Sequence, residues 1–429
     1  MRRPLFVMVV LVLATRATWG QTSPPPDQTE QVKLLLERVQ ELEKRVSELE
    51  SKQGAPPISS LSAANISASQ NPESREAAAP SAQVHQHEAR DEQAAVQQME
   101  THYPSLQIRG FGDVDFSATD EKGTRSGFSL GQLDLHLASA LSHKVSYFGE
   151  ITFNARPTGY TVEVERSIIR YDYNDYFKLS FGRYHTPIGY WNTAFHHGVW
   201  LETTIDRPQM VKVGGSFTPI HFVGFLAEGN IPSGGAGLSY NFGVGNGRGE
   251  IISRPGDASD NNNNRAWVAN IYSRPAKLYG LELGASVYRD KITLAGGQDY
   301  REWITAAYLI WTKGSPEFLT EFENVNHRNI LTGKVANSDA FYVQFAYRLP
   351  WFERTLKPYY RFEYTHMPFS EEVFKHQDQV ESILGLRYDI SSYAAFKGEY
   401  RNTRAQPGNL GQPAQPVVNG LFLQTAFTF

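Results

Sequence analysis

The sequence contains no cysteine among its 429 residues, and beyond its first twenty residues it has no apolar run long enough for a membrane-spanning helix. Without cysteine there are no disulfides, no lipid-modified cysteine and no thiolate metal site. A strong charge of one sign is also missing, because 41 Lys and Arg stand against 45 Asp and Glu, for a net charge of −4. These absences argue against a helical membrane protein, a disulfide-stabilised domain and a nucleic-acid-binding protein.

The beginning of the chain predicts export. Residues 1–20 have the pattern of a secretory signal peptide, with a positively charged start, the apolar run LFVMVVLVLA and a small-residue cleavage site at Gly20. Residues 54–103 are rich in Ala, Ser, Pro and Gln and have no periodicity, which predicts a disordered linker in the periplasm.

Residues 28–53 predict a short coiled coil that acts as an oligomerisation stalk. Its charged residues support a parallel partner, because Arg38 and Arg45 at g positions face Glu43 and Glu50 at e positions of the neighbouring helix. A lone amphipathic helix is the alternative. Val at every a position with Leu at every d position favours two strands. The predicted core residues are Val32, Leu35, Val39, Leu42, Val46 and Leu49.

From Leu106 onward, apolar and polar side chains alternate in segments of about ten residues, as in strands that separate two different solvents. The last segment, Val417 to Phe429, places leucines and phenylalanines on one face and ends on an aromatic residue, which is typical of outer-membrane barrels. Aromatic residues make up 13% of the chain, as expected of a barrel with aromatic girdles. Short connections alternate with longer polar ones, as expected when one rim faces the periplasm and the other the exterior.

The number of strands depends on how residues 186–219 are assigned. A separate strand at 209–218 would give seventeen strands, but both ends of the barrel are expected at the periplasmic rim, which requires an even number. One long loop over 186–219 gives sixteen, a size at which a barrel keeps an aqueous channel. The sequence therefore predicts an all-β fold, a 16-stranded antiparallel transmembrane β-barrel over residues 104–429, preceded by the short α-helical coiled coil.

Two motifs carry a resemblance to a known family. The stretch FGRYHTPIGYWNTAFHHGVWLETTIDRP, Phe181 to Pro208, and the segment GVGNGRG, Gly243 to Gly249, resemble the phosphate-selective porin O and P family of bacterial outer-membrane porins. The resemblance covers the barrel and not the stalk. It implies a porin-like trimer and selectivity for phosphate, which relies on stacked basic residues, but the long loop shows no such concentration of basic residues.

In general porins the third loop folds into the lumen and narrows it, and the long loop at 186–219 is the third long loop here. If it folds inward, it supplies the constriction of the pore. Its aromatic residues could instead be packing groups that hold the loop to the wall, and two adjacent histidines in extended chain point apart and do not suggest a metal pair. The candidate constriction residues are Tyr190, Trp191, His196, His197, Trp200, Glu202, Asp206 and Arg207.

Strand parity predicts which charged side chains face the lumen. A charged side chain on the lipid face near the midplane costs about 2–4 kcal/mol for Arg or Lys, so lumen placement is favoured. A basic wall opposite acidic groups would create a transverse field, although each residue could also be a solvated lumen residue without a filter role. The candidate wall residues are Lys357, Arg361, Arg387, Lys397, Arg401, Glu150, Glu163 and Glu165, with Arg361 and Arg387 expected to be the most influential cations.

These features predict a porin in the outer membrane of a Gram-negative-type bacterium that passes small ions and hydrophilic solutes by diffusion with weak selectivity. A phosphate- or anion-selective porin and a structural tether between envelope layers are the alternatives. Enzymatic activity, a cofactor and a metal are not expected, because the sequence has neither a Gly-x-Ser-x-Gly elbow nor a phosphate loop with a Gly-Lys-Ser/Thr ending. The expected partners are outer-membrane lipid, small solutes or anions, and further copies of this chain in a homotrimer.

Overall fold

The computed structural model describes residues 103–429 except 196–197, 213, 314, 375 and 406–415. The chain divides into two compact units, residues 1–75 and 76–429, and all described residues belong to the second unit. The predicted signal peptide, the coiled-coil core and nearly all of the predicted linker lie outside the described residues. None of the helices in the described part is long and apolar enough to cross a membrane.

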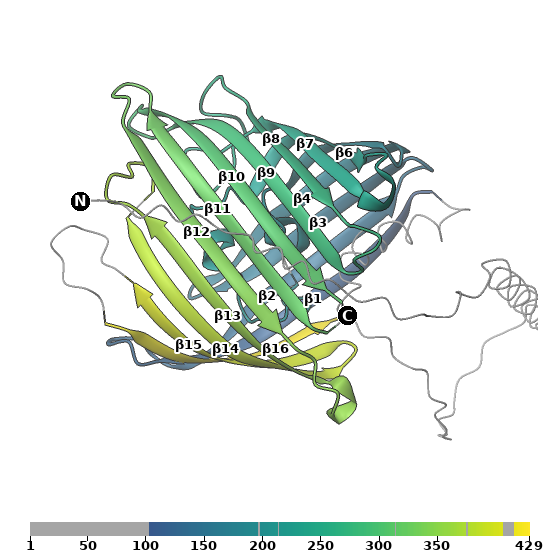
Figure 1. Cartoon of the computed structure of the whole chain (residues 1–429), viewed down its shortest axis with the longest axis vertical. Helices are drawn as coiled ribbons and strands as arrows, with labels where there is room; N and C mark the ends of the chain where they lie inside the picture. The colour runs from purple at the N-terminus through teal and green to yellow at the C-terminus, as the bar shows by residue number, and fades with distance from the viewer. Residues whose placement is uncertain (1–102, 196–197, 213, 314, 375, 406–415) are drawn as a thin grey trace, which may run out of the picture. The chain divides into compact units, whose positions relative to one another are not determined.

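The described strands form a closed antiparallel barrel of sixteen strands in which each strand pairs with its neighbours in the sequence (Figure 1). This confirms the predicted antiparallel barrel of sixteen strands, whereas the predicted coiled coil lies outside the described residues. The strands are β1 (Ser105–Thr119), β2 (Gly127–Ala140), β3 (Val145–Arg156), β4 (Gly159–Asn174), β5 (Phe177–His185), β6 (His221–Asn230), β7 (Leu238–Asn246), β8 (Ala266–Ser273), β9 (Leu281–Thr293), β10 (Asp299–Thr312), β11 (Glu317–Asn329), β12 (Val335–Ala346), β13 (Leu356–Met367), β14 (Gln377–Ser391), β15 (Ala394–Ala405) and β16 (Val418–Thr428).

The barrel closes where β16 pairs with β1. Gly110 and Phe429 exchange two backbone hydrogen bonds, with N–O distances of 2.8 and 2.9 Å. The ring of Phe429 lies directly on Gly110, because a Cβ atom at this glycine would be 2.3 Å from the ring. Glycine at position 110 therefore leaves the room that the terminal aromatic ring needs.

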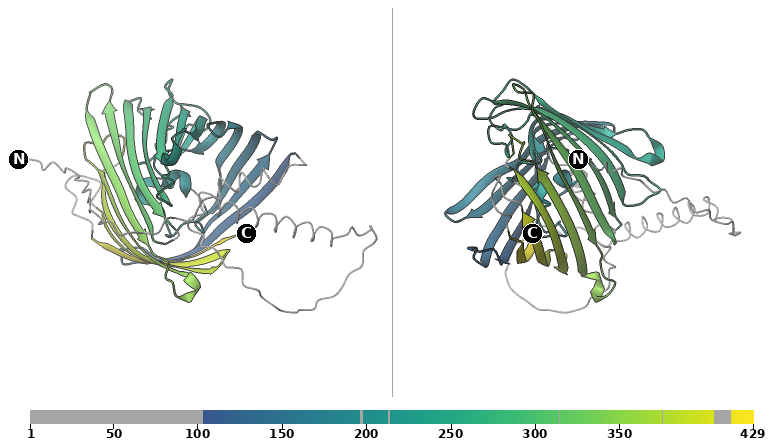
Figure 2. Two further views of the ribbon diagram at one scale, coloured as in Figure 1. Left: turned by 45° about the vertical axis from the view of Figure 1, so that its right-hand side comes forward. Right: turned by 60° about the vertical axis from the view of Figure 1, so that its left-hand side comes forward.

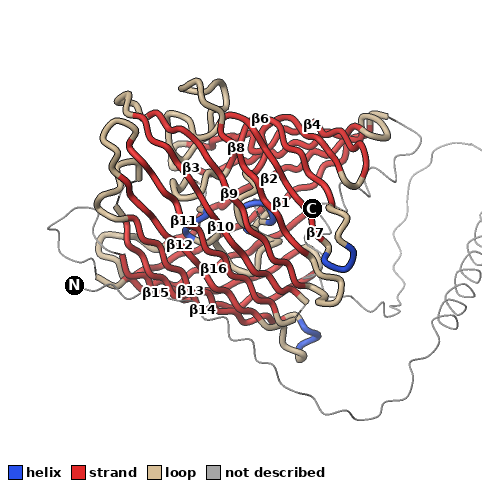
Figure 3. The backbone as a smooth tube through the Cα atoms, turned by 45° about the horizontal axis from the view of Figure 1, so that its top comes forward, coloured by secondary structure: helices blue, strands red, loops and turns tan. Residues whose placement is uncertain are grey.

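The barrel has two different rims (Figure 3). The turn rim carries the connections that precede β3, β5, β7, β9, β11, β13 and β15, together with the start of β1 and the end of β16. The loop rim carries the alternate connections, among them the long segments at 186–220 and 247–265. In bacterial barrels the shorter turns face the periplasm and the longer loops face the exterior.

The outer face of β10 shows why these strands suit a membrane. Its exposed side chains run from Trp303 through Thr305, Ala307 and Leu309 to Trp311. At about 3.4 Å per residue the two tryptophans lie about 27 Å apart along a tilted strand, close to the height of about 25 Å of the apolar band of such barrels. Trp303 also packs edge-on against Trp267 of β8, with ring centroids 5.6 Å apart, and the pair forms part of an aromatic girdle.

The largest apolar cluster of the described residues lies inside the barrel. It combines inward-facing residues of the strands, such as Tyr288, Ile304 and Tyr342, with residues of the segment 186–220, such as Trp191 and Phe217. This segment, hereafter the inward loop, follows β5 and lies within the ring of strands (Figure 2). The region 209–218 contains the 3₁₀ turn η2 (Gln209–Val211) and no strand within its described residues, which is why the barrel has sixteen strands and not seventeen.

Candidate functional site: a lumen divided by an inward loop

The inward loop is first fixed to the wall at the short helix α3 (Trp191–Ala194). Glu321 of β11 accepts hydrogen bonds from the backbone N–H groups of Tyr190 and Trp191, at 2.6 and 2.8 Å, and from the hydroxyl of Tyr342 at 2.6 Å. The first N–H groups of a helix have no partners within the helix, so a buried carboxylate satisfies them well. Gly189 has a φ of +67°, and a Cβ there would be 2.2 Å from the Glu321 carboxylate, so glycine permits this approach.

Cations of β13, β14 and β15 hold the middle of the loop by its backbone oxygens. Arg361 donates to the carbonyl of Asp206 and to the hydroxyl of Thr204, both at 2.8 Å. Arg387 donates to the carbonyls of Trp200 and Glu202 at 2.7 and 2.6 Å. Further contacts of this set are Lys397 to the carbonyls of Val199 and Thr204, Lys357 to the Thr203 hydroxyl, Arg361 to the Arg207 carbonyl, and Arg401 to the Asp206 carboxylate.

Carboxylates of the wall also hold the loop, because they accept hydrogen bonds from its N–H and hydroxyl groups. We call these wall cations and carboxylates together the clamp. Glu399 of β15 accepts from the Ile205 N–H at 2.8 Å, and Glu363 of β13 accepts from the Gln209 N–H at 2.6 Å. On the far side of the lumen, Asp134 of β2 accepts from Gly198 at 3.2 Å. The loop therefore crosses the barrel from the β11–β15 side to β2.

The predicted wall cations are buried under the inward loop and do not line an open lumen. Arg361 and Lys397 are 1% and 0% exposed, and Lys357, Arg387 and Arg401 are also buried. The structure places all five on the inner face, as parity predicted, but beneath the loop and bonded to it. Because the loop covers these cations, they do not contact an ion in the pore directly. They can affect such an ion by holding the loop in position.

Of the predicted constriction residues, Tyr190 and Trp191 are buried and pack against Tyr308 and Tyr342, with ring centroids 5.8 and 5.7 Å apart. Both rings have the surroundings of packing aromatics. Trp200 is half-buried, and His196 and His197 lie outside the described residues.

The charged residues predicted for the constriction occupy two different environments. The Asp206 side chain is 62% exposed while its carboxylate binds Arg401 at 2.5 Å. Glu202 is buried, and neither of its carboxylate oxygens has a hydrogen-bond partner among the described residues. The guanidinium nitrogens of Arg207 are likewise buried without hydrogen-bond partners in the described part of the chain. Burial raises the pKa of the Glu202 carboxyl to about 7 and lowers the pKa of the Arg207 guanidinium to about 10.

The opposite wall, formed by β3 to β6, carries charged side chains that pair with one another. A β-bulge shifts the register between Glu150 and Ile151 of β3, so that Arg166 pairs with Glu150 and Val164 with Ile151. As a result Glu165 and Arg166, although adjacent in sequence, are both buried on the inner side. Arg166 binds Glu150 at 2.5 Å.

Three histidines join these pairs. The Glu150 carboxylate lies 3.0 Å from the ring of His136 and 3.7 Å from the ring of His185. The Glu165 carboxylate lies 2.8 Å from the ring of His221. Glu163, the remaining predicted wall residue, binds Arg254 from the segment 247–265 at 3.2 Å. Among the described residues, no group of three or more His, Asp or Glu side chains is arranged to hold a metal ion.

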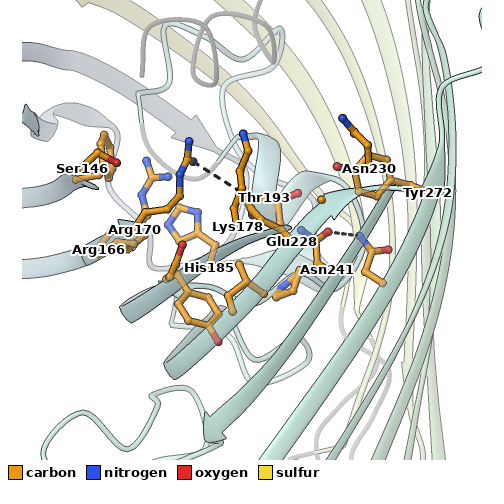
Figure 4. Close-up of a pocket in the computed structure, with 18 of the residues that line it drawn as sticks. Ser146, Arg166, Arg170, Lys178, His185, Thr193, Glu228, Asn230, Asn241 and Tyr272 are labelled. Atoms are coloured by element: carbon orange, nitrogen blue, oxygen red, sulfur yellow. Dashed lines mark hydrogen bonds and ion pairs between the residues drawn. The ribbon is translucent and has the colours of Figure 1, made fainter. Parts of the chain in front are cut away.

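A cavity lies on each side of the inward loop. The turn-side cavity has a volume of about 380 Å³, and Arg166, Arg170, Lys178 and His185 line one part of it (Figure 4). Its charged lining consists of four cations, Arg166, Arg170, Lys178 and Arg274, and three carboxylates, Asp175, Glu228 and Glu282. The loop-side cavity has a volume of about 440 Å³ and is lined by three arginines and three carboxylates, Arg156, Arg183, Arg254, Glu163, Glu165 and Asp257. Both cavities are therefore nearly balanced in charge.

Sequence reasoning missed Arg166 and Arg170 because strict alternation through Glu163 and Glu165 assigns the even-numbered residues of β4 to the lipid face. It also did not single out Arg183 of β5, which pairs with Glu165 at 3.5 Å. A signal was present. Glu165 and Arg166 are adjacent charged residues in one membrane strand, and regular alternation would place one of them in lipid at a cost of about 2–4 kcal/mol for Arg. A bulge is the inexpensive way to turn both inward.

Two further segments of the loop rim fold inward, and sequence reasoning did not anticipate either. In the GVGNGRG segment, Arg248 binds Glu302 of β10 at 2.9 Å and donates to the Phe217 carbonyl of the inward loop at 2.6 Å. In the loop between β13 and β14, Glu371 lies 2.9 Å from the ring of His327. Burial alone would raise the pKa of the Glu371 carboxyl, but the hydrogen bond with His327 holds this pKa below its ordinary value.

No protein-family model matches the sequence. No curated protein matches it either. Several solved structures of outer-membrane porins and channels share its fold. An anion-selective porin from Comamonas acidovorans has a TM-score of 0.56 and 12% identity, and the match covers 76% of this chain and 100% of that one. OmpF of Salmonella typhi has a TM-score of 0.55 and 11% identity, with 76% and 98% covered. The outer membrane channel DcaP of Acinetobacter baumannii has a TM-score of 0.52 and 14% identity, with 76% and 97% covered.

At these identities the likeness is one of fold. The chain thus shares the barrel fold of these outer-membrane porins and channels.

Proposed function

We propose that the chain is an outer-membrane porin through which small ions and hydrophilic solutes diffuse passively with weak charge selectivity. The observation that carries this proposal is the charge balance of the two cavities on either side of the inward loop. Four cations with three carboxylates line one, and three of each line the other. A wall of this kind attracts neither anions nor cations strongly, because selective pores depend on rings or clusters of one sign.

Planar-bilayer recording tests this proposal directly. The purified protein should insert as a conducting channel, and a salt gradient should give a small reversal potential. A protein that never conducts would instead support a tether between envelope layers. Saturable block of the chloride current by micromolar phosphate would support the phosphate-selective alternative, which the resemblance of two sequence motifs suggests.

An anion-selective pore has two supporting observations of its own. Among the solved structures with this fold is a porin described as anion-selective, and the turn-side cavity has one cation in excess. A reversal potential that corresponds to an anion preference of about tenfold or more would favour this function over the weakly selective pore.

We also propose a homotrimer in the outer membrane, with the stalk at 28–53 in the periplasm. One solved structure with this fold is described as a trimer form of OmpT from Vibrio cholerae. The heptad pattern supports association, although Val at a and Leu at d alone favour two strands. Deleting residues 21–53 should leave a barrel with heat-modifiable gel mobility and weaken the oligomer. An identical cross-linking pattern before and after the deletion would contradict a role for the stalk.

A further inference from the structure

The outer face of the barrel carries a group of cations at the loop rim. Arg301 of β10 lies directly opposite Lys291 of β9 on one side and Arg328 of β11 on the other. One row further toward the midplane, Arg289 lies between Trp267 of β8 and Trp303 of β10. We call Arg289, Lys291, Arg301 and Arg328 the rim cluster. Its strands β9, β10 and β11 lie side by side on one wall (Figure 1).

These side chains point out of the barrel and not into the lumen. Along β10 and β11 the residues at the positions of Arg301 and Arg328 are exposed, whereas their chain neighbours Glu302, His327 and Asn329 are buried on the inner side. Arg301 shares its face with Trp303, which lies about 7 Å away along the strand. Since Trp303 belongs to the aromatic girdle, the row of Lys291, Arg301 and Arg328 lies at the level of lipid headgroups.

The cluster is poorly compensated within the protein. Lys291 binds Asp299 at 2.8 Å, and this is the one carboxylate that neutralises a member of the cluster within the described part of the chain. Arg289, Arg301 and Arg328 have no ion-pair or hydrogen-bond partner among the described residues. Like charges placed directly opposite each other on neighbouring strands destabilise a sheet. Arg301 and Arg328 lie directly opposite each other and neither has a carboxylate partner among the described residues, so this pair calls for an anion from outside the chain.

The turn rim of the same strands shows no such row. There the outward positions are occupied by Leu281, Leu283, Trp311 and Phe318. The described cations of that rim, Arg274, Lys277 and Lys313, lie in the connecting turns, and Arg274 binds Glu282 at 2.8 Å. The basic row thus faces the leaflet on the loop side, which is the outer leaflet when longer loops face the exterior.

We propose that the rim cluster binds the phosphate groups of a phosphorylated glycolipid in the outer leaflet. Guanidinium groups match phosphate with parallel hydrogen bonds, and Arg is the residue that suits such planar recognition. The tryptophans beside Arg289 provide an apolar surface for the acyl chains just below the headgroup. The inference rests on the proposed placement in an outer membrane, and not on conductance or selectivity.

The test uses the purified full-length chain in a neutral detergent with lipid A, a glycolipid that carries two phosphates, as the probe. Native mass spectrometry measures how much lipid remains bound over a titration. Wild-type protein should bind lipid A at least about tenfold more tightly than the same lipid without phosphates. Equal binding of the two lipids would overturn the proposal without any variant.

R301E/R328E should lower lipid A affinity by about tenfold or more, because each substitution replaces an attraction with a repulsion. The matched control K277E/K313E makes the same change of charge at the turn rim and should bind lipid A like wild type. Heat-modifiable gel mobility shows that each variant is folded, and R301Q/R328Q serves if the charge reversal prevents folding. Wild-type affinity in a folded rim variant, or an equal loss in the control, would contradict the proposal.

Inorganic phosphate distinguishes the two sources of the anion. At up to millimolar concentration it should not displace lipid A, since it has no acyl chains to hold it at the girdle. Displacement at this concentration would assign the cluster to free phosphate and overturn the lipid assignment. Single-channel conductance of R301E/R328E should equal that of wild type, because the rim cluster lies outside the lumen. Failure of the lipid-binding proposal is therefore distinguishable from failure of the porin proposal.

Discussion

Charged residues hold the inward loop on one side of the lumen and line open cavities on the other. On the β11–β15 side, Arg361, Arg387 and Lys397 donate to carbonyls of the inward loop, and Glu321 and Glu399 accept from its N–H groups. On the β3–β6 side, the charged side chains bind one another and line the two cavities. A charge whose partner is backbone holds structure in place, whereas a charge beside an open cavity can act on solutes.

The same contrast appears in what a substitution would leave behind. On the clamped side a removed cation leaves buried carbonyls without a donor, which costs about 1–3 kcal/mol for each unsatisfied group. On the open side, removal of Arg170 leaves the carboxylates of Asp172 and Glu228, which are 35% and 28% exposed and are therefore solvated by water. The location of a charge thus decides whether a mutation alters the shape of the pore or its selectivity.

The largest expected effect comes from breaking the clamp. In R361A/K397A the backbone carbonyls of Asp206 and Thr204 lose hydrogen-bond donors. The Glu363 carboxylate also loses the Arg361 guanidinium, which lies 2.6 Å away. Removing one member of a buried charged pair costs about 3–5 kcal/mol. The loop should leave the wall, single-channel conductance should change by a factor of about two or more, and a protease should cut within residues 186–220. R170A, on the open side, is the control and should leave the loop protected. Unchanged conductance in the double variant would show that the loop is held by other means.

Next in size is a pH effect of Glu202 on the stability of the clamped side. Burial raises the pKa of this carboxyl from 4.5 to about 7, so the folded protein binds the proton more tightly than the unfolded chain. The resulting stabilisation is fully present below about pH 4.5 and is lost as the pH rises through about 7. Its upper limit is about 3 kcal/mol. Thermal unfolding in detergent at pH 5 and pH 8 should differ less for E202Q than for wild type. An equal difference for both proteins would assign the pH dependence to other groups.

Reversing charge on the open side should change selectivity with little change in conductance. Arg170 and Lys178 line the turn-side cavity, so R170E/K178E converts an excess of cations there into an excess of carboxylates. The ratio of cation to anion permeability should rise by up to about tenfold, because a negatively charged wall raises the local concentration of cations. R361Q is the comparison variant. On the clamped side the loss of a cation should change conductance more than selectivity, because the cation holds the loop in position. A reversal potential equal to that of wild type in R170E/K178E would mean that ions do not pass this wall.

The smallest effect is expected for an exposed ion pair. Arg254 binds Glu163 at 3.2 Å, but its side chain is 61% exposed. Pairs of this kind contribute about 0–1 kcal/mol. R254Q should therefore unfold within about 1 kcal/mol of wild type in detergent. A larger loss would show that this pair holds the segment 247–265 in place, as the buried pairs hold the inward loop.

Alternation and strand parity were sufficient to predict the barrel, because a membrane strand exposes its two faces to very different solvents. They also predicted that Arg361 and Lys397 face inward. They could not show that the loop covers these residues, because the hydrogen bonds go to backbone carbonyls that every residue possesses. Parity failed at Glu165 and Arg166, where a bulge interrupts it. The rim cluster likewise depends on register across β9, β10 and β11, and the sequence alone does not show which residues of neighbouring strands lie opposite each other.

The seam between β1 and β16 also sets the order of events during biogenesis. The hydroxyl of Thr428 and the carbonyl of Gly110 meet in it at 3.0 Å, although they are 318 residues apart in the chain. No barrel can close until the ribosome has completed β16, so folding cannot proceed domain by domain during translation as it does in many soluble proteins. Contacts between such distant residues also form slowly. Until that point β1 and β16 remain open edges of the sheet, and an unpaired strand edge promotes aggregation.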